Sequence, residues 1–183
     1  MRNRTQQAAL LILIGTLTLT GCDQSTGGPP IGEVLSVSAD SFPAWGTVCD
    51  PGATVTITPD DQVVVTWSPM DPDADCVGYD GTAQSGQAPP GTFEQIAALV
   101  TASPYHRLDT ELQPSQQISD GSSEHVTVRT ADGTQTKGGH MVGDYGPRAF
   151  QDVYHAVRDA ADAAGTDVTL RPCDPGRCSH DGP

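Results

Sequence analysis

Three aspartates, Asp71, Asp73 and Asp75, stand at alternate positions in the chain. Calcium takes several oxygen ligands that converge from a tight turn, so this spacing is typical of a calcium loop. Counted from Asp71, however, the sixth position is Cys76 where an EF-hand needs glycine, and the twelfth is Thr82 where it needs glutamate. We therefore expect a solvated acidic loop held by Cys76 and no cofactor, with calcium as the alternative.

Four cysteines follow in the body of the chain, at Cys49, Cys76, Cys173 and Cys178. An even number favours disulfides in an exported protein, because disulfides persist outside the cytoplasm. Cys173 and Cys178 flank a Pro-Gly turn, which favours their pairing and leaves Cys49 for Cys76, although four cysteines permit three pairings. Zinc bound by Cys173, Cys178 and His180 is the alternative, but no fourth ligand lies near them in the sequence.

No spacing of nucleophiles and bases indicates an enzyme. The five histidines stand singly, and none belongs to the His-Glu-x-x-His pattern of zinc proteases. Ser85 precedes a glycine, but Ala83 occupies the place of the first glycine in a hydrolase nucleophile elbow. The sequence thus predicts no catalytic residue. A Ser/His/Asp triad could still be assembled by folding, because geometry and not order defines it.

Cys22 ends a different kind of pattern. Arg2 and Arg4 precede an apolar run from Ala8 to Leu19, and small residues then lead to the cysteine. This layout is typical of an export signal. The run is too short for a membrane span, which needs about 20 apolar residues.

The segment Leu19-Thr20-Gly21-Cys22 resembles the lipobox of a bacterial lipoprotein signal. The resemblance implies that residues 1–21 are removed and that Cys22 carries diacylglycerol and a further acyl chain such as palmitate, which together anchor a protein stably. It also implies a lipid-anchored protein at the cell membrane, with its domain on the periplasmic or extracytoplasmic side. Asp23 is similar to an inner-membrane retention signal, but the choice of membrane stays open.

The chain is acidic, with 9 basic and 23 acidic residues and a formal net charge of −14. Removing residues 1–21 would take away two arginines and no acidic residue. Such a chain repels nucleic acid and anionic headgroups. We therefore expect no nucleic-acid partner and contact with the membrane through the lipid anchor, while an envelope protein partner or cationic partners such as metal ions stay open.

Hydrophobic patterning predicts the elements that must position any site. Strands are expected at 32–39, 54–58, 63–67, 125–130, 134–141 and 167–170, with a loop over 70–90. One helix should begin at Thr92, capped by Thr92 with Gln95, and end before Pro104, and a second should run from Pro147 to Gly165. This order predicts an α+β fold with a mainly antiparallel sheet, two helices on one face and disulfide staples.

Each expected helix has one apolar face. We expect both faces to be buried against the strands, which would bring together Phe93, Ile96, Val100, Phe150, Val153 and Val157 with Val55, Ile57, Val64, Val126 and Val128.

The chain divides into a signal peptide at 1–21, a flexible tether at 22–31, a single α+β domain at 32–172 and a tail with a small cysteine loop at 173–183. Within the domain, Gly46-Thr47-Val48-Cys49-Asp50-Pro51 and the hairpin after it are similar to the opening of a bacterial family of domains of unknown function, in which Gly-x-Cys-Pro precedes a strand hairpin. The resemblance covers roughly residues 36–165 and implies no activity.

Together these features predict a membrane-anchored envelope lipoprotein that acts as a non-enzymatic binding or scaffold module. The alternative is a hydrolytic or metal-dependent envelope enzyme whose site is dispersed along the sequence.

Overall fold

The computed structural model describes residues 32–43, 51–69, 83–116 and 119–166. Within these ranges six strands form one antiparallel sheet in the order β4-β3-β2-β1-β5-β6. The strands are β1 (Val34–Pro43), β2 (Pro51–Ile57), β3 (Gln62–Pro69), β4 (Gln84–Gln87), β5 (Ser122–Thr130) and β6 (Gly133–His140). The helices are α1 (Thr92–Thr101), α2 (Ser103–His106), α3 (Val142–Tyr145) and α4 (Arg148–Ala163).

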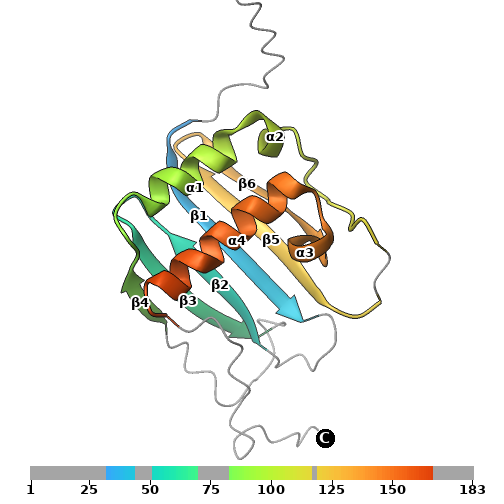
Figure 1. The fold of residues 1–183 in the computed structure, drawn as a ribbon, viewed down its shortest axis with the longest axis horizontal. Helices are drawn as coiled ribbons and strands as arrows, with labels where there is room; N and C mark the ends of the chain where they lie inside the picture. The colour runs from blue at the N-terminus through green and yellow to red at the C-terminus, as the bar shows by residue number, and fades with distance from the viewer. Residues whose placement is uncertain (1–31, 44–50, 70–82, 117–118, 167–183) are drawn as a thin grey trace, which may run out of the picture.

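The helices lie on one side of the sheet (Figure 1). The longest of them, α4, runs across the middle of the sheet and contacts β1, β2, β3 and β5, while α1 packs beside it against α4 and β1. The expected α+β class with an antiparallel sheet is thus confirmed. The two expected helices correspond to α1 and α4, and the one-turn helices α2 and α3 were not predicted.

Strand alternation gives the sheet two different surfaces. On β1, Val37 lies opposite Ile57 of β2 under the helices, and the next residue, Ser38, lies opposite Thr56 on the other side. The covered face carries Val37, Ala39, Val55, Ile57, Val63, Val65, Val126 and Val128. The open face carries Ser38, Asp40, Thr54, Thr56, Val64, Thr66, His125, Thr127 and Thr136.

The core lies between the covered face and the helices, and its buried side chains form one cluster. All six apolar helix residues predicted to be buried belong to it. Of the five predicted strand partners, four are buried, and Val64 is the exception. Val64 pairs with Thr56 on the open face, because in the run Val63-Val64-Val65 it is the two outer residues that face the helices.

Near α1, one further expectation is corrected and another is confirmed. The predicted loop over 70–90 contains β4, a short polar edge strand that lacks the apolar alternation of a strand with one buried face. Pro104 ends α1 as expected but also starts α2, because proline fits the first turn of a helix, where its missing N–H costs nothing. The predicted strand at 167–170 lies outside the described residues.

Candidate functional site

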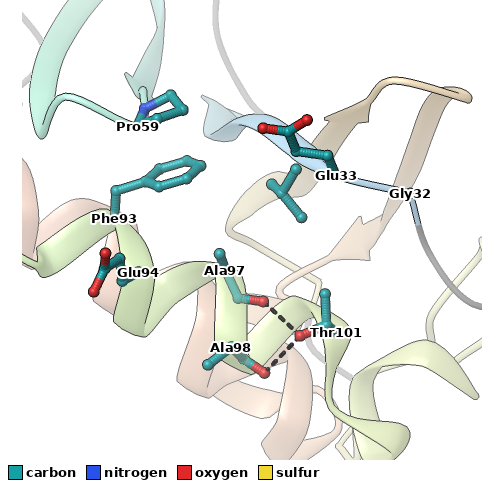
Figure 2. A pocket seen from close by; sticks show the side chains of 9 residues that line it. Gly32, Glu33, Pro59, Phe93, Glu94, Ala97, Ala98 and Thr101 are labelled. Carbon is teal, nitrogen blue, oxygen red and sulfur yellow. Dashed lines mark hydrogen bonds between the residues drawn. The ribbon is translucent and has the colours of Figure 1, made fainter.

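A groove of about 490 Å³ runs alongside α1 at the end of the sheet where β1 begins. Its apolar lining comes from three separate segments: Val34 at the start of β1, Pro59 in the β2–β3 turn, and Phe93, Ala97 and Ala98 on α1. Figure 2 shows the Phe93 ring facing Pro59, with the two alanines farther along the helix. The groove therefore offers an open apolar surface on the rigid flank of a helix.

Asp61, in the β2–β3 turn, fixes α1 in this position. Its carboxylate accepts hydrogen bonds from the backbone N–H of Gly91 (2.8 Å) and of Phe93 (2.7 Å), two of the donors that a helix start leaves unpaired. Both turns need left-handed backbone, with φ of 58° at Asp61 and 84° at Gly91. Thr92 begins the helix as predicted, but its hydroxyl donates to the Pro89 carbonyl (2.6 Å), so the predicted capping role belongs to Asp61.

The polar side chains of the groove are two exposed carboxylates and one hydroxyl. Glu33 stands at the start of β1 and Glu94 on the first turn of α1 (Figure 2). The Thr101 hydroxyl donates to the carbonyls of Ala97 (2.8 Å) and Ala98 (3.2 Å), as the dashed lines in Figure 2 show. The free side-chain groups of the lining are thus hydrogen-bond acceptors that carry negative charge.

A third carboxylate lies beside the groove. Asp132, in the β5–β6 turn, packs against Gly32, where a Cβ would collide with its carboxylate. Across the described ranges, the salt bridges involve Asp40, Asp144 and Asp152, and none involves Glu33, Glu94 or Asp132. This end of the sheet therefore carries acidic groups that the described residues do not neutralise.

On the open face, by contrast, polar side chains bond to each other across the strands. Ser38 bonds to Thr56 (2.8 Å between hydroxyl oxygens), and Thr127 bonds to Thr136 (3.0 Å). These cross-strand pairs connect β1 with β2 and β5 with β6.

Asp40 and His125 form the most polar pair on that face. His125 Nδ1 lies 3.0 Å from Asp40 Oδ1, and the ring lies over Gly138 of β6, where a Cβ would collide with it. The hydrogen bond to Asp40 raises the pKa of His125, and partial burial opposes that rise. A carboxylate at Nδ1 is also found beside the histidine of a Ser-His-Asp triad, where Nε2 acts as the base.

Among the described residues, two charged side chains are buried on the covered face, and both bind backbone groups. Glu124, 4% exposed, accepts hydrogen bonds from the Gly143 N–H (2.6 Å) and the Ser122 hydroxyl (2.5 Å). Lys137, 1% exposed, donates to the carbonyls of Leu108 and His106, the latter at 3.4 Å.

Lys137 also lies over the Tyr105 ring, with Nζ 5.6 Å from the ring centroid. Burial lowers the pKa of Lys137 and raises that of Tyr105. Lys137 ties α2 to the sheet, and Glu124 ties α3 to it, so the role of both buried charges is structural.

The residues singled out from the sequence lie outside the described part of the chain. These are Cys22, the cysteines at Cys49, Cys76, Cys173 and Cys178, the aspartates Asp71, Asp73 and Asp75, and His180. Their lipidation, disulfides and calcium binding stay predictions. Elsewhere, within the described ranges, no group of three His, Cys, Asp or Glu side chains is placed to hold a metal ion.

Glu33, Glu94 and Asp61 were missed at the sequence level. Nothing in their spacing marks them, because the groove brings together segments about 30 to 60 residues apart.

Protein-family models and curated proteins give no match to this chain. None of the helices in the described ranges is long and apolar enough to cross a membrane.

Proposed function

We propose that the protein is a lipid-anchored, non-enzymatic binding module of the bacterial cell envelope, held by Cys22 and using the groove beside α1 as its binding site. The observation that carries the binding role is the groove itself, because it combines an apolar lining with carboxylates that have no ion-pair partner in the described structure. The open-face pairs and the buried charges are already engaged in holding strands and helices together.

The position of the groove suits an anchored protein. Gly32, which lines it, follows directly on the ten residues 22–31. Ten residues span at most about 36 Å when fully extended. A lipid on Cys22 would therefore keep the groove close to the membrane surface and restrict its partners to those found there.

Two structural disulfides complete the proposal, Cys49 with Cys76 and Cys173 with Cys178. Export to an oxidising compartment and the even number of cysteines support them. A first loop of this length would contribute roughly 3 kcal/mol in the chain-entropy model.

A hydrolase is the second candidate, and the Asp40–His125 pair supports it. The carboxylate at Nδ1 and the other ring nitrogen would supply an orienting carboxylate and a base, and a hydroxyl such as that of Thr127, two residues along β5, would have to act as nucleophile. If this candidate is right, His125→Ala abolishes hydrolysis of activated ester substrates by a protein that still unfolds cooperatively.

The anchor is tested by Cys22→Ser. We expect the native protein to fractionate with membranes and to carry an acylated cysteine at its N-terminus, and the variant to accumulate as precursor or to leave the membrane. A mature native protein with an unmodified N-terminus upstream of Cys22, measured by mass spectrometry, contradicts the proposal.

A further inference from the structure

Resting on the proposed function, we infer that the groove beside α1 binds a cationic amphipathic peptide segment, with a Lys or Arg side chain at Glu33 and Glu94 and an apolar side chain against Phe93 and Ala97. We take this segment to belong to an envelope protein, because the proposed anchor at Cys22 would hold the groove beside the membrane.

The apolar half of the inference rests on the groove lining. Val34 and Phe93 are buried beneath the groove, and Ala97, Ala98 and Pro59 complete an apolar surface without long side chains. A ligand side chain placed there would lose water contact on one side at a gain of roughly 25 cal/mol per Å² of apolar area. Small residues on α1 leave the room for it.

The cationic half rests on the charges at the rim. Glu33 directly precedes β1 and Glu94 lies on α1, so the two carboxylates border the groove from different segments (Figure 2). Asp132 adds a third negative charge next to Gly32. Because the side chains of the lining offer acceptors and the Thr101 hydroxyl donates to its own helix, a ligand that supplies donors and positive charge complements the groove best.

Other occupants fit less well. An anionic membrane surface would meet like charge, in a chain with a formal net charge of −14. A bound metal ion would need ligands that converge, and no such group of His, Cys, Asp or Glu occurs in the part of the chain described by the structure. A second copy of this acidic chain would bring the same charge to the same rim.

The experiment uses the full-length protein in a non-ionic detergent and fluorescence anisotropy of a labelled synthetic peptide of alternating lysine and leucine. Two further peptides separate the contributions: lysine alternating with serine keeps the charge, and leucine alternating with serine keeps the apolar side chains. We expect measurable binding of the first peptide, weakened by salt, and much weaker binding of the other two.

Paired variants locate the site. Glu33→Gln with Glu94→Gln should weaken binding about tenfold, as expected for two exposed ion pairs. Asp159→Asn with Asp162→Asn removes two exposed charges from α4 and should leave binding within about twofold. Ala98→Lys puts a competing cation in the groove and should abolish binding, whereas Ala163→Lys, an exposed position on α4, should not.

Any of three results with the variants and control peptides overturns the inference: equal weakening by the two pairs of carboxylate variants, undiminished binding to Ala98→Lys, or equal affinity for the lysine–serine or the leucine–serine peptide. An absence of binding to the lysine–leucine peptide also overturns it. None of these results depends on lipidation of Cys22, which the Cys22→Ser experiment tests separately. Failure of this inference is therefore distinguishable from failure of the proposed membrane anchor.

Discussion

The two faces of the sheet differ in how their polar side chains are buried and hydrogen-bonded. On the covered face, Glu124 and Lys137 are buried, and both bind backbone groups of the chain that lies over them. On the open face, polar side chains are half-exposed and bond to one another, as Ser38 does with Thr56. Burial makes an unpaired polar group costly, while exposure lets water replace a lost partner. The covered face should therefore dominate stability, and the open face should tolerate change.

The largest loss is expected from Phe150→Ala on the covered side. Phe150 is fully buried on α4 and stacks on Tyr154, with ring centroids 5.9 Å apart. Its truncation leaves a cavity and should cost about 3 to 5 kcal/mol. Urea unfolding of the full-length protein measures the change. An unchanged midpoint would show that α4 does not anchor the core.

A smaller loss is expected from Glu124→Ala. The substitution leaves the buried Gly143 N–H without its acceptor and should lower the free energy of unfolding by about 1 to 3 kcal/mol. Glu124→Gln keeps one acceptor oxygen and should lose less. If the two variants unfold at the same midpoint as the native protein, the carboxylate does not hold α3 on the sheet.

The Asp40–His125 pair on the open face should make the stability of the protein depend on pH. The pKa of His125 is raised in the folded protein. The stability that its pairing with Asp40 contributes is therefore fully present below the ordinary pKa of 6.5 and is lost as pH rises through the raised pKa. The half-exposed pair should contribute at most about 1 kcal/mol. Asp40→Asn should therefore destabilise the protein more at about pH 5.5 than at about pH 8.5. Equal destabilisation at both pH values contradicts the pairing.

The smallest effect is expected from Thr127→Ala, also on the open face. Its hydroxyl bond to Thr136 is exposed, and loss of one such cross-strand pair costs about 0.5 kcal/mol. A loss above about 2 kcal/mol would mean that the open face is not solvated.

The sequence predicted those parts of the fold that depend on local periodicity. Phe93 and Phe150 stand on apolar stripes, and β-branched runs bounded by turns predicted both hairpins. It failed where distant residues decide the outcome. Which of Val63, Val64 and Val65 face the core depends on pairing with β2. The start of α1 depends on the hydrogen bond from the Gly91 N–H to the carboxylate of Asp61, which lies 30 residues earlier in the chain.

The candidate site could not be predicted for the same reason. Val34, Pro59 and Phe93 are unremarkable in sequence and form a groove only when β1, the β2–β3 turn and α1 meet. The candidate site residues that the sequence did single out lie outside the described ranges: Cys22, Cys49, Asp71, Asp73, Asp75, Cys76, Cys173, Cys178 and His180. Their chemistry stays a prediction, which the Cys22→Ser experiment addresses for the anchor.

We propose that binding occurs at the groove and not elsewhere on the sheet. Hydrogen–deuterium exchange of the full-length protein, with and without the lysine–leucine peptide, tests it most directly. We expect the peptide to slow exchange at 58–61 and in the first turns of α1, the segments that border the groove, and to leave β6 unchanged. Slowed exchange confined to residues 134–140 of β6 would contradict this proposal and place the binding site at that edge of the sheet, away from the groove.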